Sequence, residues 1–401
     1  MGRPARARKP LRQRLKRWLL VLGVAAPVAG IGLWILVHKV EWLGPLIANT
    51  LRALVGSDNV AKLEDGVYAV EDRFNRAVRK DEKPKAYWDV PSGQKGPPGK
   101  GTEARPFTLA DVGPMLKSWS APGDGQWVKI EEGMPRAEPP YLYKTLLHPD
   151  RNRSWAEVFV VAVDLRRVRV HAVAGSQEPK ALEKDAKDYK RLARIPDAHH
   201  KDVLGAFNGS FMTEHGNYGM KIDGVTLVKA RDKVCTVAAY KDDSLRIGSW
   251  PNLAASEADM VWFRQGPTCM YEEGTIHPGL AVDGNARWGA TLDGETVIRR
   301  SAAGINKQGD VLYVAITNHT TARAIATALK HAGAETVTQL DVNWSYPKFV
   351  LFQAEPGSNV RKAVALAKGF EFSDDEYIRK RSMRDFFYLM PKKPADHSAR
   401  N

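Results

Sequence analysis

The pattern of hydrophobic and polar residues divides the chain into three parts. Residues 18–37 form a run of twenty residues without a charged side chain. In residues 41–80, apolar side chains recur at the spacing of amphipathic helices, with a break at 56–58 where a second helix can begin. From Trp155 onward, short runs rich in β-branched residues alternate with turn residues, which predicts strands.

Two of these runs, 158–163 and 168–173, are close enough to predict a hairpin around the turn at 164–167. Further strands are predicted at 203–207, 234–240, 260–264, 297–304, 311–317, 336–340 and 348–352. One helix is expected among them, capped by Thr320 or Thr321 and ended by Gly333. Residues 353–401 predict a helix after Ser373 and a strand at 386–390, with no function assigned to either.

Many strands with few helices predict an α+β fold, a large mixed β-sheet domain preceded by an N-terminal transmembrane helix and a helical stalk. The stalk is residues 41–80. Residues 81–106 are expected to be a flexible linker, because their second half is rich in Pro, Gly and charge. The domain itself is expected at 107–401, with its clearest strand pattern in 155–352.

The uncharged run is long enough to cross a bilayer, because twenty helical residues span ~30 Å. Residues 1–17 carry eight basic side chains and no acidic one, so they are expected to form a cytoplasmic arm. This predicts a single-pass anchor at 18–38 with the C-terminal domain exported, either periplasmic or extracellular. A cleaved signal peptide is the alternative, since Ala25, Ala26 and Ala29 offer small residues for cleavage.

The basic arm also explains most of the net charge of +14, since the remaining 384 residues carry only about +6. No nucleic-acid-binding motif accompanies it, so the expected partner is the membrane and not nucleic acid. The two cysteines, Cys235 and Cys269, are too few for a structural zinc site. Export permits a disulfide between them, and a bridge and two buried thiols both remain open.

Four short segments place polar residues at turns beside predicted strands. They are Phe207-Asn-Gly-Ser-Phe211, Gln265-Gly-Pro-Thr268, Arg299-Arg-Ser-Ala-Ala-Gly304 and Leu340-Asp-Val-Asn-Trp-Ser345. Each segment taken alone also fits an ordinary tight turn or a solvated charge. Their order along the chain carries more information than any one of them.

In that order the segments resemble the phosphodiester glycosidase family. The family pattern runs Asn-Gly-Gly-Phe-Phe, a strand ending in Asp-Gly, a Gly-Pro turn, Arg-Thr-Ala-x-Gly, a helix, and Leu-Asp-Gly-Gly-Gly-Ser. The matching residues are Asn208, Gly209, Phe211, Asp223, Gly224, Gly266, Pro267, Arg300, Ala302, Gly304, Leu340, Asp341 and Ser345. The resemblance covers residues 155–352.

The resemblance implies hydrolysis of a sugar-1-phosphate diester at its glycosidic bond, on glycans of the cell envelope. A carboxylate suits the developing oxocarbenium ion and an arginine suits the departing phosphate. It implies Asp341 as the principal carboxylate, with Arg300 and Asn208 holding the phosphate or the sugar.

Further substrate contacts are expected from Gly209, Phe211, His215, Gly304, Asn343, Trp344 and Ser345. Asp223 is one option for a second carboxylate. No cofactor is identified, although a divalent cation beside Asp341 is compatible with the residues.

The chain departs from the family where Val342, Asn343 and Trp344 replace a run of glycines. Glycine lets a backbone approach its substrate closely, and neither valine nor tryptophan can imitate it. The pocket is then either reshaped, with Trp344 stacking on a sugar ring, or no longer catalytic. The second interpretation predicts a glycan-binding or envelope-assembly protein with the same fold. A general phosphodiesterase or nuclease is less favoured, because no His/Asp metal constellation is visible.

Overall fold

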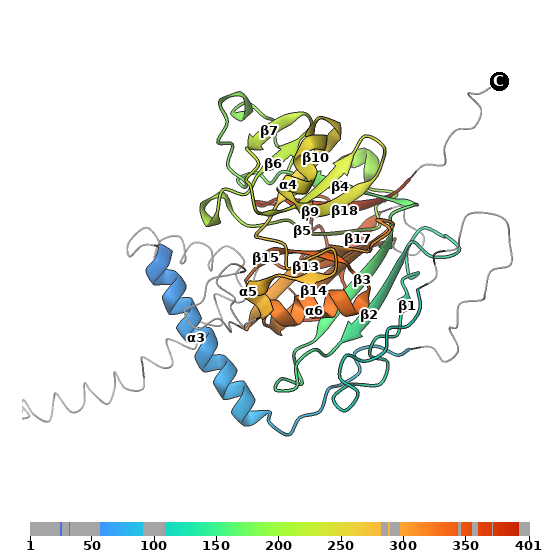
Figure 1. Ribbon diagram of the computed structural model, residues 1–401. Coiled ribbons are helices and arrows are strands. Elements are labelled where there is room, and N and C mark those ends of the chain that lie inside the picture. The colour runs from blue at the N-terminus through green and yellow to red at the C-terminus, as the bar shows by residue number, and fades with distance from the viewer. Residues whose placement is uncertain are drawn as a thin grey trace, which may run out of the picture. The chain divides into compact units, whose positions relative to one another are not determined.

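The structure is a computed structural model that describes residues 25, 32, 57–90, 107, 109–281, 288, 297–343, 346–354, 360–370 and 372–392. The predicted arm, nearly all of the predicted anchor and most of the predicted linker lie outside these residues. Among the described residues, no helix combines the length and the apolar character that a membrane span needs. The chain divides into two compact units, Met1–Glu64 and Asp65–Asn401, and every strand belongs to the second (Figure 1).

A helix begins at Ser57, where the sequence pattern predicted a new start. This helix, α3 (Ser57–Val78), is the longest described element. The other α-helices whose bounds fall among the described residues are shorter: α4 (Trp250–Leu253), α5 (Pro278–Ala281) and α6 (Ala322–Ala332). Helix α6 confirms the predicted helix, since the Thr321 side chain accepts a hydrogen bond from the Ala324 amide and Gly333 ends the helix at a φ of 118°.

The strands form three sheets, and every pair of neighbouring strands in them is antiparallel. The mostly-β domain with few helices is confirmed, but one large mixed sheet is replaced by three antiparallel ones. The eight-stranded sheet runs in the order β1-β2-β3-β14-β13-β15-β11-β12. Its strands are β1 (Val128–Lys129), β2 (Leu142–Leu147), β3 (Val158–Asp164), β14 (Val311–Thr320), β13 (Ile298–Ile305), β15 (Thr336–Val342), β11 (Tyr271–Glu272) and β12 (Thr275–Ile276).

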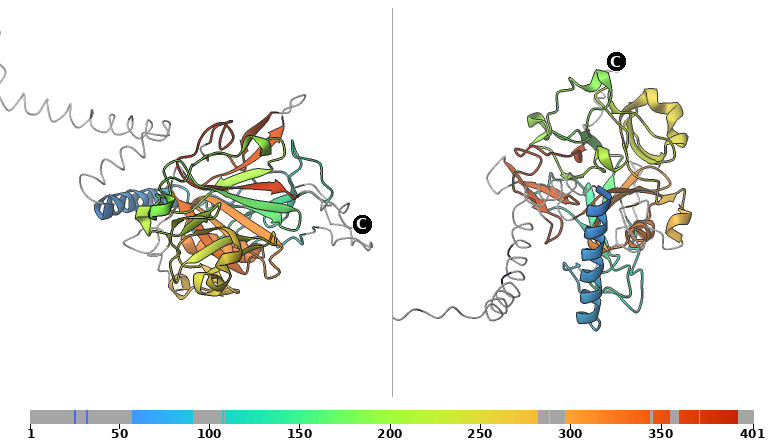
Figure 2. Two further views of the ribbon diagram at one scale, coloured as in Figure 1. Left: turned by 90° about the horizontal axis from the view of Figure 1, so that it is seen from above. Right: turned by 90° about the vertical axis from the view of Figure 1, so that its left-hand side faces the viewer.

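Two five-stranded sheets complete the domain, in the orders β17-β16-β5-β18-β4 and β7-β6-β10-β8-β9. The strands of the first are β17 (Arg361–Ala365), β16 (Phe349–Ala354), β5 (Gly205–Asn208), β18 (Phe386–Pro391) and β4 (Val168–Val173). Those of the second are β7 (Val225–Val228), β6 (Met220–Ile222), β10 (Met260–Gln265), β8 (Cys235–Tyr240) and β9 (Leu245–Ser249). Both sheets lie on the side of the eight-stranded sheet away from α6 (Figures 1 and 2).

This layering explains why the central strands are apolar without alternation. In β3, Val158 and Val160 pack in the apolar cluster that contains α6. Their neighbours Phe159 and Val161 point the other way, into a cluster shared with Phe207 of the first five-stranded sheet. A strand covered on both faces buries every side chain, so its sequence is a continuous hydrophobic run.

The predicted hairpin of 158–163 with 168–173 is wrong. Strand β3 pairs with β2 and β14, whereas β4 pairs with β18 in another sheet. The Asp164 carboxylate accepts hydrogen bonds from Arg166 and Arg167, which hold the short turn as the chain leaves one sheet for the next. The predicted helix after Ser373 is also absent, because residues 374–379 form turns and bridges.

Cys235 and Cys269 are joined by a disulfide, which settles the choice that the sequence left open. The bridge ties the start of β8 to the segment that follows the Gly266-Pro267 turn. Both cysteines are buried in the shared apolar cluster. The chain therefore fixes this turn covalently as well as by packing.

Candidate active site

The Asn208–Phe211 segment leaves the end of β5 and contacts both β13 and β15. The Asn208 side chain donates to the Ser301 hydroxyl at 2.8 Å and accepts from the Lys348 amide at 3.1 Å. Ser301 in turn donates to the backbone carbonyl of Asp341 at 2.7 Å. The Asp341 amide closes the circle by donating to the carbonyl of Gly209 at 3.0 Å. Three of the sequence motifs therefore meet at one point.

The Asp341 carboxylate stands near the end of β15, and only 3% of the residue is exposed. One carboxylate oxygen accepts from the Val342 amide at 2.9 Å, and the other contacts the Arg384 guanidinium. Burial raises the pKa of the Asp341 carboxyl above its ordinary value, although Arg384, the Val342 amide and His215 oppose this by favouring the ionised form. A buried carboxyl whose pKa is raised in this way is typical of groups that transfer protons at active sites.

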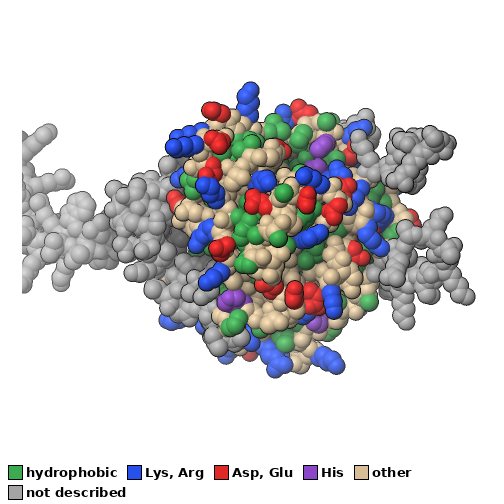
Figure 3. All heavy atoms as spheres, turned by 45° about the horizontal axis from the view of Figure 1, so that its top comes forward, with side chains coloured by type: hydrophobic (Ala, Val, Ile, Leu, Met, Phe, Trp, Pro, Cys, Tyr) green, Lys and Arg blue, Asp and Glu red, His purple; other side chains and the backbone are tan. Residues whose placement is uncertain are grey.

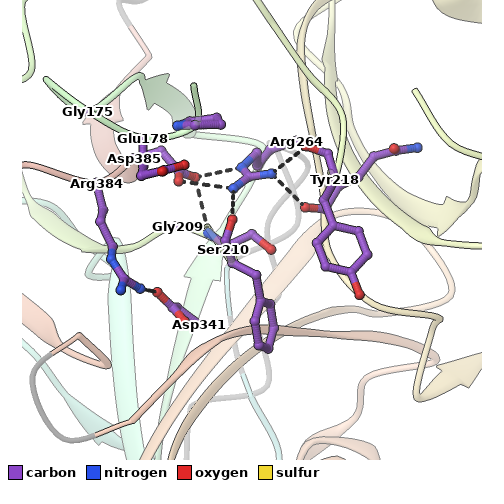
Figure 4. Close-up of polar contacts among 12 residues, drawn as sticks. Gly175, Glu178, Gly209, Ser210, Tyr218, Arg264, Asp341, Arg384 and Asp385 are labelled. Atoms are coloured by element: carbon purple, nitrogen blue, oxygen red, sulfur yellow. Dashed lines mark hydrogen bonds and ion pairs between the residues drawn. The ribbon is translucent and has the colours of Figure 1, made fainter. Parts of the chain in front are cut away.

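Arg384 supplies the positive charge at this site. Its guanidinium contacts Asp341 (Figure 4). It also lies 3.2 Å from the centre of the Tyr346 ring and contacts the Met212 sulfur. The side chain of Arg384 is 14% exposed, so it is more accessible than the carboxylate it holds. A guanidinium fork of this kind can hold a phosphate by two hydrogen bonds at once.

A second, deeper ion pair supports this arrangement. Arg264 at the end of β10 donates to both carboxylate oxygens of Asp385, at 2.8 and 3.2 Å, and both side chains are buried (Figure 4). The same guanidinium donates to the carbonyls of Phe211 and Tyr218, at 2.6 and 3.0 Å. The Asp385 carboxylate also accepts from the Ser210 amide at 3.1 Å. The pair therefore fixes the Asn208–Phe211 segment against the start of β18.

Close backbone contacts explain two glycines of the motifs. A Cβ at Gly209 would lie 2.0 Å from an Asp385 carboxylate oxygen, and one at Gly266 would lie 2.7 Å from the Gln339 carbonyl. Glycine is required at both positions because another part of the site occupies the space of a side chain. The Gly-Pro turn thus belongs to the same assembly as the Asn208–Phe211 segment.

The buried Glu178 fixes the backbone that follows Met212. The Glu178 carboxylate accepts from the amide and the hydroxyl of Thr213, at 2.9 and 2.7 Å. Thr213 opens the short 3-10 helix Thr213–His215. His215 at the end of this helix is near enough to lower the pKa of Asp341 through its charge.

The guanidinium of Arg300 does not join this group. It lies fully buried toward the α6 side of β13, where it donates to the Thr320 carbonyl at 3.1 Å, to the Gln339 side chain at 3.0 Å and to the Trp288 carbonyl. The expected convergence of an amide, a guanidinium and a carboxylate therefore occurs with Arg384 in place of Arg300. The physical reason is that neighbouring strand residues face opposite sides, so Ser301 faces the site and Arg300 does not.

The other predicted substrate contacts are spread more widely. The Phe211 ring is buried 6.0 Å from that of Tyr218. Gly304 lies away from the site, against Ala334, near the opposite end of β13. Asn343 has a positive φ of 93° and accepts a hydrogen bond from Tyr68 of α3 at 2.8 Å. Trp344 and Ser345 lie outside the described residues.

Asp223 occupies the tight turn between β6 and β7, where it accepts a hydrogen bond from Tyr189 at 2.7 Å and has a positive φ of 51°. The Asp223 side chain is exposed, and its role is to stabilise this turn. Within the described ranges, no three His, Cys, Asp or Glu side chains gather as metal ligands would. On the face shown in Figure 3, acidic and basic side chains are interspersed among the described residues.

A pocket of about 380 Å³ lies elsewhere, between the segment Glu131–Tyr141 and the adjoining strand ends at Ile130 and Leu142. None of its lining residues belongs to the motifs. The geometry of the Asp341 site therefore does not depend on this pocket.

Comparison with known proteins gives a distant structural similarity. No protein-family model matches the chain, and no curated protein matches its sequence. The catalytic domain of zebrafish N-acetylglucosamine-1-phosphodiester alpha-N-acetylglucosaminidase, auto-inhibited by its pro-peptide, is 18% identical with a TM-score of 0.40. That alignment covers 66% of this chain and 87% of the zebrafish chain.

Two further solved structures are similar at a lower level. A hypothetical protein from Synechocystis is 8% identical with a TM-score of 0.33, over 63% of this chain and 62% of its own. A protein of Burkholderia pseudomallei described as exported is 10% identical with a TM-score of 0.25, over 59% and 74%. These similarities are too distant to assign roles, which follow here from the contacts of the site itself.

The sequence missed Arg384, Asp385 and Arg264. Two signals pointed to them: Arg264 is a charged residue near the end of an apolar strand, and Arg384-Asp385 immediately precede the aromatic run of β18. Charges beside fully buried strands need partners, because an isolated buried charge is costly. Neither signal says which charges pair.

Proposed function

We propose that the chain is a membrane-anchored hydrolase of the phosphodiester glycosidase type, acting on sugar-1-phosphate diesters of envelope glycans on the export side of the membrane. The observation that carries the proposal is the contact between the buried Asp341 carboxylate and the Arg384 guanidinium. It brings an acid–base group and a phosphate-holding group together beside Asn208.

In the proposed reaction, the phosphate of the substrate competes with Asp341 for the guanidinium of Arg384. Once Arg384 turns to the phosphate, Asp341 loses its positive neighbour and becomes a stronger base. A water molecule attacks the anomeric carbon and gives its proton to Asp341. The bond between that carbon and the phosphate oxygen breaks, and its electron pair leaves on the phosphate. The products are a free sugar and a phosphomonoester.

Arg384 contributes most when the phosphate departs, because the phosphomonoester gains negative charge at that step. Asn208 is held by Ser301 and Lys348, so it is preorganised to position the sugar. A divalent cation is not required by this scheme, and one beside Asp341 would assist the same departure.

A non-catalytic glycan-binding or envelope-assembly protein is the second candidate. It is favoured by the burial of Asp341, whose two carboxylate oxygens both have partners. A substrate must displace Arg384 before the carboxylate can act. Binding of glycan without product would support this candidate over the hydrolase.

The test is hydrolysis of a sugar-1-phosphate diester in water labelled with heavy oxygen. Cleavage of the glycosidic bond places the label on the sugar, whereas cleavage by a phosphodiesterase places it on the phosphate. Asp341→Asn is expected to lower turnover about 10²- to 10⁴-fold with folding preserved. Asp223→Asn, which changes an exposed turn carboxylate, is the matched control and should leave turnover unchanged. Undiminished turnover in Asp341→Asn would remove this residue from the mechanism.

A further inference from the structure

Helix α3 exposes an apolar stripe that its own domain does not cover. Val70, Phe74 and Val78 are 67%, 66% and 65% exposed. They follow one another at four-residue spacing, so they lie along one face of the helix. Large apolar side chains exposed in a row commonly mark a contact surface.

The opposite face of α3 is attached to the domain. The Tyr68 hydroxyl donates to the Asn343 side chain at 2.8 Å. Asp72 receives two hydrogen bonds from Arg153, both at 2.7 Å, and the side chains of this pair are only 10% and 5% exposed. Arg79, just beyond the helix, stacks on the Trp155 ring. These contacts fix the rotation of the helix, so the stripe faces outward.

The exposed charges nearest one edge of the stripe are basic. Arg73 is exposed within the helix and Lys80 is exposed just beyond its end, whereas Glu71, at the other edge of the stripe, is partly buried. Arg76 pairs with Asp72 at 3.1 Å, so it belongs to the face that is attached to the domain. An apolar centre flanked by basic side chains is typical of helices that lie in the interface of a lipid bilayer.

We propose that the stripe Val70, Phe74 and Val78 docks α3 on an anionic lipid surface. The apolar side chains enter the boundary between headgroups and acyl chains, and the flanking basic side chains meet the lipid phosphates. A second copy of the chain fits less well, because two such faces would bring their Arg73 and Lys80 side chains together. This inference does not depend on the proposed hydrolase activity.

The test uses the full-length protein with one new thiol. Both native cysteines are in the disulfide, so Phe74→Cys offers a single site for a fluorophore that reports polarity. The labelled protein is reconstituted into phosphatidylcholine vesicles with or without phosphatidylglycerol. With phosphatidylglycerol, we expect the emission to shift to the blue and to be quenched by nitroxide-labelled lipid.

Two matched controls sharpen this test. Val261→Cys labels another exposed apolar residue, on β10, and its emission should not respond to lipid. Adding Arg73→Gln and Lys80→Gln to Phe74→Cys should lower the ratio of docked to undocked helix about fivefold per charge. Circular dichroism of each variant checks that the fold is retained.

Two results would overturn the proposal. One is a label at residue 74 that stays in water on both kinds of vesicle. The other is burial of the label without regard to lipid, together with disulfide-linked dimers of the unlabelled Phe74→Cys variant, which would show that a second copy covers the stripe.

Discussion

The Arg384 guanidinium contacts the Asp341 carboxylate across 43 residues of sequence. Asp341 lies near the end of a strand that the motifs predicted, whereas Arg384 lies in a tail to which the sequence assigned no function. The sequence alone makes Arg300 and Arg384 equally suited to hold a phosphate. In the structure only Arg384 reaches Asp341, because Arg300 is buried among backbone carbonyls on the α6 side. Which arginine serves the site is therefore decided by position.

Replacing each of these arginines with lysine should separate activity from stability. Arg384→Lys keeps the charge but loses the fork that can hold phosphate, so kcat/KM on a sugar-1-phosphate diester should fall about 100-fold. Arg300→Lys should instead lower the free energy of unfolding by about 1.5–3 kcal/mol, because hydrogen bonds from its buried guanidinium are lost. Steady-state kinetics and denaturant unfolding measure the two effects. The reverse pattern would restore Arg300 as the phosphate-holding residue.

The Arg264–Asp385 pair should be essential to folding. Removing one partner, as in Arg264→Met, leaves a buried charge without its partner and should cost about 3–5 kcal/mol of stability. The double variant Arg264→Met with Asp385→Leu should recover part of this loss, because no charge then remains buried. Urea unfolding of the two single variants and the double variant gives the coupling between them. Additive losses would mean that the two side chains do not act as a pair.

Gly209→Ala should disturb the site more than a glycine substitution elsewhere. The new methyl group would meet the Asp385 carboxylate, so the segment or the ion pair must move. We expect a loss of about 1–3 kcal/mol in stability, the usual cost of overpacking. Gly248→Ala is the control, because a Cβ there finds its nearest atoms at 3.7 Å. Equal thermal midpoints for the two variants would contradict the close approach.

Acid should destabilise the domain through two partly buried histidines. Burial, with help from nearby positive charge, lowers the pKa of His171 and of His319 from 6.5 to about 4. The unfolded chain binds more protons than the folded one between these values, so stability is lost as pH falls from about 6.5 to 4. His171→Gln should reduce the slope of stability against pH by roughly half in this window, because His319 retains its share. An unchanged slope would show that His171 titrates normally in the folded protein.

Strong local patterns predicted the elements of the fold well. The cap at Thr321, the stop at Gly333 and the continuous apolar runs of β3 and β14 depend on neighbouring residues, which the sequence displays directly. The pairing of strands was harder to predict. Nearness in sequence suggested a hairpin between β3 and β4, but each strand finds its partners more than a hundred residues away or in a preceding segment.

The site was predicted in part for the same reason. Asn208 and Gly209 follow β5 in one sheet, and hydrogen bonds join them to Ser301 of β13 and Asp341 of β15 in another. The side on which Arg300 lies could not be predicted, because β13 is buried on both faces and its register shifts on either side of that residue. Arg384 and Asp385 carried no motif at all, and only the position of β18 beside β5 brings them to the site.

The place of β18 has a consequence for synthesis of the protein. This strand lies between β5 and β4 in its sheet, although it is the last of the described strands to leave the ribosome. Until it inserts, the sheet has a gap between two strands made much earlier, and neither guanidinium–carboxylate contact can form. A nascent chain therefore cannot form either contact until residues 384 and 385 have been translated, and a stop codon before residue 384 removes both contacts from the product.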